Sequence, residues 1–190
     1  MQDTGDSREA GGRRSCAEDL ERMRAGRRIA SKVGELLRLR QESLALAESC
    51  TGGLIAAAMT TVAGSSEYVW GSAVVYSAAA KQTMLGLDGA ILDEHGTVSR
   101  ETTAALAREA KRISGATHGL AVTGWAGPGG GSDADPVGTV FLALASPDGS
   151  KTRRCSFSGD RAAIRYQALE SALEWLLEKL SAPGRDRDSV

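Results

Sequence analysis

The sequence predicts an α/β domain with a mixed sheet that is covered by helices on both faces. Short apolar runs of strand length alternate along the chain with amphipathic runs of helical period, which is the pattern of α/β folds. Glycines end several of the helical runs. One hairpin, with Pro147-Asp148-Gly149 as its turn, adds an antiparallel pair of strands and makes the sheet mixed.

The composition is typical of one globular domain. The chain has 190 residues, of which 42% are hydrophobic and 25% charged, and this length is too short for two ordinary domains. A formal net charge of -1 provides no attraction for nucleic acid, so we exclude a nucleic-acid partner. No apolar stretch approaches the roughly 20 residues that span a bilayer, and the polar N-terminus lacks a signal sequence. We therefore expect a cytoplasmic protein that does not bind membranes.

The two ends of the chain differ from its middle. Residues 1–16 and 183–190 contain few apolar side chains, and we expect disordered tails on either side of a domain at 17–182. Cys16, Cys50 and Cys155 are odd in number and match no metal-ligand spacing. We expect three reduced thiols and no metal site.

The first half of the chain predicts three helices and two strands. Apolar residues recur with helical period in the first helix, and the second strand (YVWGSAVVY) is rich in β-branched and aromatic residues. Glycines end the second and third helices. In chain order, we expect a helix at 17–40, a strand at 44–47, a helix at 54–62, a strand at 68–76 and a helix at 78–85.

The second half predicts two helices and three strands. Ser99 is the expected N-cap of a helix at 100–113, and a buried strand at 120–123 follows it. This strand leads into a glycine-rich segment, Gly124 to Ser132, that fits neither a helix nor a regular strand. We then expect hairpin strands at 137–145 and 152–157 and a last helix at 160–180.

Ser49 is the first candidate catalytic residue, because it lies in a strand-to-helix turn. The first N–H groups of a helix have no partner within it, and Gly52 and Gly53 let the backbone approach a ligand closely. We expect an anion or a developing oxyanion to be stabilised at this turn.

The residues offer a lysine rather than a histidine as the base for this serine. We interpret His95 and His118 as exposed loop residues, and the G-x-S-x-G pattern of α/β-hydrolases is absent. Lys81 follows Tyr76 at the next strand-to-helix junction, among alanines. A desolvated lysine loses its proton near neutral pH and can activate a serine. From the residues alone, a solvent-facing lysine and a strand-end tyrosine remain alternatives.

Two further motifs suit an anionic ligand. Consecutive glycines after Gly124 fit neither the Walker A pattern nor the dinucleotide fingerprint, but they can form a nest of N–H groups, and a flexible surface loop is the alternative. Arg161 and Arg165 lie one helical turn apart near a helix start. Arginine pairs can bind phosphate through two hydrogen bonds each, although an exposed charged helix start explains the same pattern.

Six segments of the chain match the motifs of one family in the same order. They are AESCTGGLIAA (47–57), VAGSSEYVWG (62–71), VVYSAAAKQTMLGL (74–87), HGTVS (95–99), VTGWAGPGGGSDADPVGTVFLAL (122–144) and FSGDRAAIR (157–165). Together they resemble the CinA C-terminal domain family, whose enzymatic members are nicotinamide-nucleotide amidohydrolases (NMN deamidases). The resemblance implies a three-layer α/β/α sandwich that hydrolyses the carboxamide of nicotinamide mononucleotide to nicotinate mononucleotide and ammonia, without a cofactor or a metal.

The resemblance also assigns roles to residues. It implies that Ser49 is the nucleophile, Lys81 its general base and Tyr76 a hydroxyl that orients or relays the proton. It further implies a homo-oligomer, dimeric or larger, whose small-molecule partner is the nucleotide. About 40 residues before Leu44 are too few for the large upstream domain of many members, so we expect the stand-alone form. The expected substrate-binding residues are Thr51, Gly52, Gly53, Thr123, Gly124, Gly129, Gly130, Arg161 and Arg165.

Three positions depart from the family pattern. Ala78 replaces an asparagine before the lysine, Trp125 replaces an isoleucine, and Asp135 stands where a lysine is common. Ala78 and Trp125 motivate an alternative, a catalytically weak nucleotide-binding module with a regulatory role. A third hypothesis is thiol chemistry by Cys50, because helix N-termini lower thiol pKa values.

Overall fold

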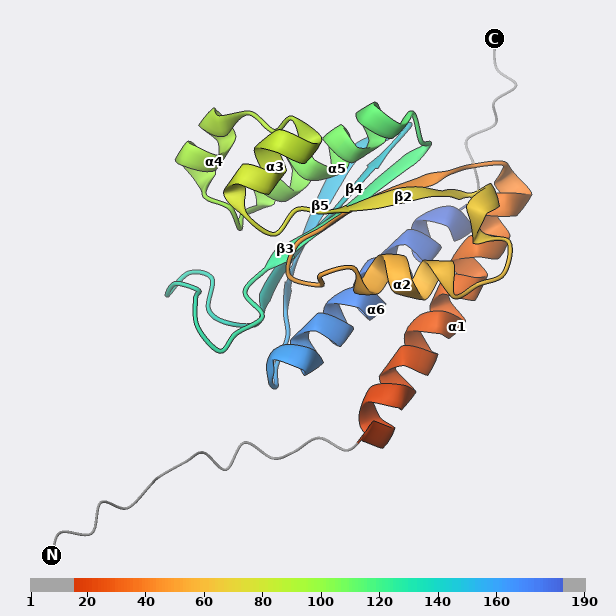
Figure 1. The fold of residues 1–190 in the computed structure, drawn as a ribbon, viewed down its shortest axis with the longest axis horizontal. Coiled ribbons are helices and arrows are strands. Elements are labelled where there is room, and N and C mark those ends of the chain that lie inside the picture. Colours follow the sequence, from red (N-terminus) through yellow and green to blue (C-terminus); the bar gives the residue numbers. More distant parts are fainter. Residues whose placement is uncertain (1–15, 183–190) are drawn as a thin grey trace, which may run out of the picture.

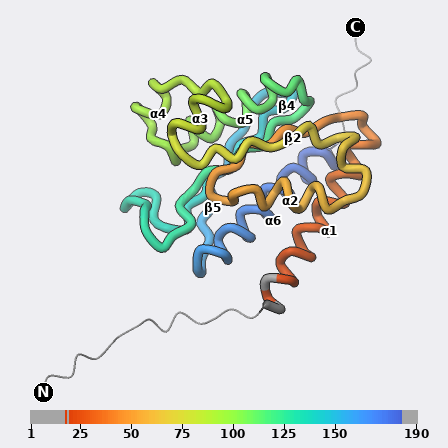
Figure 2. Tube along the Cα trace, viewed as in Figure 1, coloured from red at the N-terminus to blue at the C-terminus, as the bar shows by residue number. Residues whose placement is uncertain are grey.

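The computed structural model describes residues 16–182, which form one five-stranded mixed sheet with helices on both faces (Figures 1 and 2). The strand order is β2-β1-β3-β4-β5; β1 pairs in parallel with β2 and β3, whereas β3–β4 and β4–β5 are antiparallel. The strands are β1 (Leu44–Glu48), β2 (Val69–Val74), β3 (His118–Gly124), β4 (Thr139–Ser146) and β5 (Gly149–Ser156). The helices are α1 (Cys16–Arg40), α2 (Leu54–Thr60), α3 (Ala78–Leu85), α4 (Gly89–His95), α5 (Arg100–Ser114), α6 (Arg161–Ser181) and the 3₁₀ turn η1 (Ser65–Glu67).

The helices form two layers, as the three-layer sandwich requires. Helices α1, α2 and α6 cover one face of the sheet, and α3, α4 and α5 cover the other (Figure 1). Strand β1 shows how one strand serves both layers, since alternate side chains point to opposite faces. Leu44 and Leu46 belong to the core beneath α1 and α6, whereas Ala45 and Ala47 belong to the core beneath α5. The small alanines let α5 pack closely on the sheet.

The segments that the sequence analysis singled out lie together at one end of the sheet. The parallel strands β1, β2 and β3 end there, and Glu48 is level with Val74 and Val122 in the ladder. The antiparallel strand β5 also ends at this end of the sheet, so that α6 begins beside the other motifs. In open α/β sheets, ligands bind outside the carboxyl ends of the parallel strands.

Most predicted elements are present, including the hairpin of β4 and β5. The sequence missed two short ones, η1 and α4. Helix α4 begins after Asp88, whose side chain accepts a hydrogen bond from the Ala90 N–H. His95 is therefore the last residue of a helix and not part of a turn. The tails expected at 1–15 and 183–190 lie outside the described residues, and Cys16, assigned to the first tail, begins α1.

The interpretation of His118 as an exposed loop residue is wrong. It is the first residue of β3 and is buried, with its Nε2 2.7 Å from Glu42 Oε2. Burial is the main cause that lowers the pKa of His118, while the hydrogen bond to Glu42 opposes it. The pair lies at the start of β3, at the opposite end of that strand from Gly124, so His118 has no access to Ser49.

Candidate active site

Ser49 directly follows β1 and is held by the two strands that flank it. Its N–H donates to the Val122 carbonyl of β3 over 3.0 Å, and the Glu48 carbonyl before it accepts from the Val75 N–H over 2.8 Å. The side chain of Ser49 is 7% exposed. The turn is thus fixed on both sides, and a small part of the serine remains accessible.

The Glu48 carboxylate caps helix α2, a feature that the sequence analysis did not single out. The helix has Gly53 at its N-cap position, which supplies no side-chain oxygen. Instead, Glu48 Oε2 accepts from the N–H groups of Gly53 (3.0 Å) and Ile55 (3.2 Å), and Oε1 accepts from Ala56 N–H (2.8 Å) and the Ser72 hydroxyl (3.3 Å). Glu48 is fully buried. A negative charge therefore already occupies the helix N-terminus.

This cap changes the set of amides that an oxyanion could use. The N–H of Gly53 donates to Glu48, and the N–H of Gly52 donates to the Ser49 carbonyl over 3.0 Å. The expectation that both glycine amides serve an oxyanion is therefore not met in this geometry. The N–H groups of Cys50 and Thr51 face the Cys50 thiol and lower its pKa, and within residues 16–182 no backbone or side-chain oxygen accepts from either of them.

Lys81 is buried and lies beside Ser49, which rules out the alternative of a solvent-facing lysine. Its Nζ is 3.4 Å from Ser49 Oγ and donates to the Val75 carbonyl over 2.9 Å. Helix α3 sets this direction, because Ser77 caps its first turn by accepting from the Ala80 N–H. Burial lowers the pKa of Lys81 below its ordinary value. The neutral amine that a general base needs therefore forms more readily than it does for an exposed lysine.

Tyr76 and Arg161 form one polar contact at the mouth of this region. Arg161 Nη2 donates to the Tyr76 hydroxyl over 3.0 Å, and Nη1 donates to the Gly127 carbonyl over 2.6 Å. The arginine thus connects the end of β2 to the glycine-rich segment. The Tyr76 side chain is 62% exposed, so a ligand can reach it.

Arg165 supports the turn that carries Ser49 by binding two of its carbonyl groups. Its Nε donates to the Cys50 carbonyl over 3.1 Å, and its Nη2 donates to the Thr51 carbonyl over 2.6 Å. A Cβ atom at Gly52 would lie 3.2 Å from Arg165 Nη2, which explains why a glycine suits this place. The two arginines expected to clamp a phosphate therefore bind separate segments of the protein.

The two threonines expected to hold substrate are both fully buried. Thr123 Oγ1 lies 2.6 Å from Thr103 Oγ1, which also donates to the Ser99 carbonyl over 2.6 Å. Since Thr103 has only one hydroxyl hydrogen, Thr123 is the donor in their contact and keeps free acceptor positions. Thr51 Oγ1 is buried and has no hydrogen-bond partner among the described residues. Contact of either hydroxyl with a substrate would need local movement.

The glycine-rich segment is packed at its ends and open at its tip. A Cβ atom at Gly124 would lie 2.8 Å from the Thr139 carbonyl, so this position requires close contact with β4. Gly130 lies against the ring of Trp125, where a Cβ atom would come within 2.5 Å of Cε3. Gly129 is exposed, with open space beside it. The tip is therefore accessible to a ligand, as expected for a binding loop or a surface loop.

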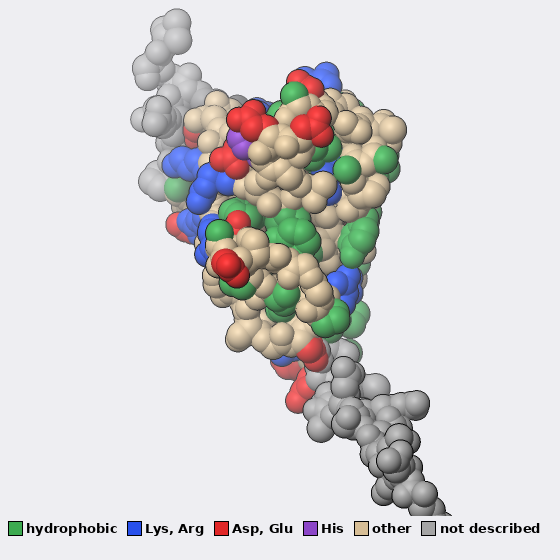
Figure 3. Space-filling model, turned by 90° about the vertical axis from the view of Figure 1, so that its left-hand side faces the viewer, with side chains coloured by type: hydrophobic (Ala, Val, Ile, Leu, Met, Phe, Trp, Pro, Cys, Tyr) green, Lys and Arg blue, Asp and Glu red, His purple; other side chains and the backbone are tan. Residues whose placement is uncertain are grey.

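Figure 3 shows this end of the molecule, with α3 and α4 at the top and hydrophobic side chains gathered near the middle of the face.

Asp135, one of the positions that depart from the family pattern, pairs with Arg154 of β5 (Nε–Oδ1 2.8 Å). The aspartate thus anchors the end of the glycine-rich segment to the hairpin. Ala78 is exposed at the start of α3, where Ser77 already provides the cap.

The buried Cys50 is unsuited to thiol chemistry. Burial raises its pKa to about 12, and the neighbouring Arg165 and the local N–H groups lower it only in part. The premise that the helix N-terminus lowers this pKa is wrong here, since Glu48 occupies that position. Cys50 and Cys155 are free thiols. Among residues 16–182, no group of three or more His, Cys, Asp or Glu side chains could hold a metal ion.

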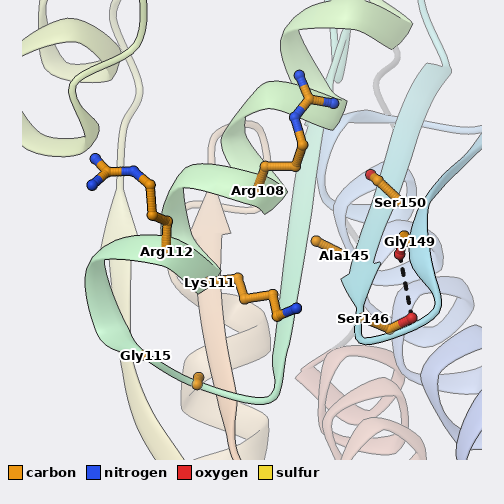
Figure 4. A pocket seen from close by; sticks show the side chains of 9 residues that line it. Arg108, Lys111, Arg112, Gly115, Ala145, Ser146, Gly149 and Ser150 are labelled. Carbon is orange, nitrogen blue, oxygen red and sulfur yellow. Dashed lines mark hydrogen bonds between the residues drawn. The ribbon is translucent and has the colours of Figure 1, made fainter.

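A separate cavity of about 470 Å³ lies at the opposite end of the sheet, between α5 and the β4–β5 hairpin (Figure 4). Arg108, Lys111 and Arg112 line it, but their side chains point in different directions, and Arg112 pairs with Glu109. Lys111 and Arg112 also lie in the last turn of α5, where cations offset the helix dipole. The cavity contains none of the candidate catalytic residues.

Comparison with known proteins identifies the family. The family model described as the CinA C-terminal domain matches residues 26–180, which is most of the chain. The chain belongs to the CinA C-terminal domain family. A CinA-like protein of Geobacter sulfurreducens is 49% identical over 152 residues, and one of Myxococcus xanthus is 50% identical over 155 residues. Each alignment covers 80% of this chain but 37% of the relative, so the chain spans little more than a third of their length.

Solved structures of the CinA superfamily have the same α/β fold. The competence damage-inducible protein A of Klebsiella pneumoniae is 33% identical with a TM-score of 0.80, covering 84% of this chain and 99% of that one. The competence/damage inducible protein CihA of Agrobacterium tumefaciens is 39% identical with a TM-score of 0.73, covering 83% and 94%. Separately, no helix within residues 16–182 is long and apolar enough to cross a membrane.

Proposed function

We propose that this CinA-family chain is a nicotinamide-nucleotide amidohydrolase that converts nicotinamide mononucleotide to nicotinate mononucleotide and ammonia by a serine–lysine mechanism. The observation that carries the proposal is the contact between Lys81 Nζ and Ser49 Oγ, 3.4 Å apart. A nucleophile within reach of a buried base whose pKa is lowered is the arrangement that amide hydrolysis requires. The substrate itself is taken from the family resemblance.

The first half of the reaction forms an acyl-enzyme. The neutral amine of Lys81 takes the hydroxyl proton as Ser49 Oγ bonds to the carboxamide carbon, whose oxygen becomes an oxyanion. The Val75 carbonyl, which accepts one N–H of Lys81, helps to hold the lone pair of Nζ toward the serine. The proton then passes to the amide nitrogen, the carbon–nitrogen bond breaks, and ammonia leaves. This step yields an ester between Ser49 and the nicotinoyl group.

The second half releases the acid. Lys81 accepts a proton from water, the hydroxide oxygen bonds to the ester carbon, and the bond to Ser49 Oγ breaks as the serine regains its proton. The N–H groups of Cys50 and Thr51 are the proposed donors to the oxyanion in both halves, in exchange for the Cys50 thiol that they face, because those of Gly52 and Gly53 bind oxygens within the protein. Tyr76, held by Arg161, is proposed to orient the substrate beside the serine.

For the nucleotide phosphate, we propose Arg161 and the exposed glycines Gly129 and Gly130. Arg161 lies between Tyr76 and the glycine-rich segment, and its guanidinium can exchange the Gly127 carbonyl for a phosphate oxygen. Arg165 is better suited to support the turn, because it holds two of the carbonyls of that turn. Ammonia release from nicotinamide mononucleotide, compared between the wild type, Ser49→Ala and Lys81→Ala, tests the proposal.

The competing function is a nucleotide-binding module without turnover, which Ala78 and Trp125 motivated. The geometry gives this reading little support. Ser77 caps α3 without an asparagine at position 78, and the Trp125 ring packs on Gly130. Neither change separates Ser49 from Lys81. A folded wild type that binds the nucleotide but releases no ammonia would establish the binding module instead.

A further inference from the structure

Two buried threonines from different elements share one chain of hydrogen bonds near the candidate nucleophile. Helix α5 covers β3 on the face of the sheet that also carries α3 (Figure 1). On this face Thr103 of α5 and Thr123 of β3 place their Oγ1 atoms 2.6 Å apart, and the Thr103 hydroxyl also contacts the Ser99 carbonyl over 2.6 Å. Both threonines are fully buried. The reaction proposed above assigns no role to Thr103.

The hydrogen bonds of this chain can run in one direction only. A carbonyl oxygen accepts and never donates, so the single hydroxyl hydrogen of Thr103 lies toward the Ser99 carbonyl. The contact between the two hydroxyls must then use the hydrogen of Thr123. Thr123 has no hydrogen left for a ligand, and its Oγ1 presents lone pairs alone. It can accept a hydrogen bond from a ligand but cannot donate one.

Thr123 is a lateral neighbour of Ser49. Strands β1 and β3 are parallel, Ala47 is level with Ala121, and both alanines belong to the core beneath α5. Ser49 and Thr123 each lie two residues further along the chain, and every second side chain of a strand points to the same face. Both therefore point to the α5 face, where Lys81 Nζ lies 3.4 Å from Ser49 Oγ. The acceptor oxygen of Thr123 thus flanks the place where Ser49 would bond to a substrate.

We infer that Thr103 is a positioning residue that makes the site select a carboxamide over a carboxylate, an inference that rests on the proposed function. By accepting the hydrogen of Thr123, Thr103 leaves that residue as a pure acceptor. The carboxamide nitrogen of a substrate carries two N–H donors, one of which Thr123 accepts. The carboxylate of the acid product has only acceptors to place against the same oxygen, and two facing acceptors repel each other.

The same contact serves the reaction. With one N–H held by Thr123, the nitrogen is kept beside Ser49, where it receives the proton from Lys81 before ammonia leaves. The acid formed afterwards meets an oxygen that cannot donate to it, which favours its release. Because Thr123 is fully buried, the contact forms with the local movement that any substrate contact of this hydroxyl needs.

The test compares the binding of two nucleotides that differ only in this group. Nicotinamide mononucleotide and nicotinate mononucleotide are titrated calorimetrically into Ser49→Ala protein, which leaves the amide intact, and the ratio of the two dissociation constants is measured. Adding Thr103→Val removes the hydroxyl but keeps a similar shape, and the Ser99 carbonyl still accepts from the Thr103 position's N–H over 3.1 Å. The preference for the amide should fall at least about fivefold, because Thr123 can now donate to the carboxylate.

Thr102→Val is the matched control. Thr102 is the preceding residue of α5, is fully buried, and donates its hydroxyl to the Gly96 carbonyl over 2.6 Å rather than to Thr123. Thr102→Val and the conservative Thr103→Ser should both keep the ratio within about twofold of the parent. Circular dichroism shows that each variant is folded, and Thr103→Ala, which also lacks the hydroxyl, replaces the valine variant if that one does not fold.

An unchanged ratio in the folded Thr103 variants without a hydroxyl overturns the inference, as does an equal fall in Thr102→Val. Binding of neither nucleotide overturns it as well. The proposed function is decided separately, by ammonia release from protein with Ser49 intact. A chain that shows the shift in ratio but releases no ammonia would keep the selection and lose the reaction, whereas one that releases ammonia without the shift would keep the reaction and lose the role of Thr103.

Discussion

Replacing the Glu48 carboxylate by an amide should strongly destabilise the protein, although Glu48→Gln changes neither size nor shape. The carboxylate accepts three backbone N–H groups and one hydroxyl. Glutamine must place its NH₂ group on one side. If it replaces Oε2, it faces the N–H groups of both Gly53 and Ile55; if it replaces Oε1, it faces that of Ala56, while the Ser72 hydroxyl can rotate to accept. The second orientation loses fewer hydrogen bonds.

The cost of that orientation can be estimated from its parts. The part-buried N–H of Ala56 loses its acceptor, which costs about 1–3 kcal/mol, and two charged hydrogen bonds become neutral, at a further loss of roughly 1 kcal/mol. We expect a decrease in the free energy of unfolding of about 2–4 kcal/mol for Glu48→Gln, measured by urea unfolding. Glu67→Gln, at an exposed residue that pairs with Arg38, is the control and should change stability by less than about 0.5 kcal/mol. Equal stability of both variants would refute the capping role of Glu48.

Further predictions concern Lys81, Arg165 and Cys50. The folded pKa of Lys81 is lowered, so between that lowered pKa and about pH 10.4 the unfolded chain binds more protons than the folded one, and stability rises with pH in that window. Lys81→Met should therefore be more stable than the wild type near neutral pH, with a difference that shrinks toward pH 10.4; a constant difference would contradict the lowered pKa. Turnover should rise with pH and level off below pH 10.4, as followed by ammonia release across a pH series; a profile without this rise would argue against Lys81 as the base. Arg165→Ala, which frees the carbonyls of Cys50 and Thr51, should lower kcat at least about tenfold and leave the KM for nicotinamide mononucleotide within about threefold; a change mainly in KM would indicate a substrate contact. Cys50→Ala should retain turnover, because its thiol is buried with a pKa of about 12; complete loss of activity in a folded variant would revive thiol chemistry.

The turn that carries Ser49 was predictable from the sequence, because an apolar run, two glycines and an amphipathic run follow one another there. The sequence could not fix the partner of the serine. Lys81 lies 32 residues away, and its inward direction depends on the Ser77 cap and on burial against the sheet. From spacing alone, an exposed lysine was the favoured interpretation.

Glu48 shows why part of the site escaped prediction. A glutamate at the end of a strand is usually on the surface, and its role here depends on backbone N–H groups that only the folded chain places around it. One signal was available, since Gly53 leaves α2 without a capping side chain. His118 was misjudged for a similar reason, because its partner Glu42 is 76 residues away and joins it only in the fold. Helix α4 is short and begins at a glycine, which conceals it from pattern analysis.

The central claim is that Ser49 and Lys81 hydrolyse the carboxamide of nicotinamide mononucleotide. The most direct measurement is ammonia release from this nucleotide by the purified wild type, by Ser49→Ala and by Lys81→Ala, with the folding of each protein checked by circular dichroism. We predict turnover by the wild type and its loss in both variants. A folded wild type that releases no ammonia, or a Ser49→Ala protein that retains full turnover, would contradict the account.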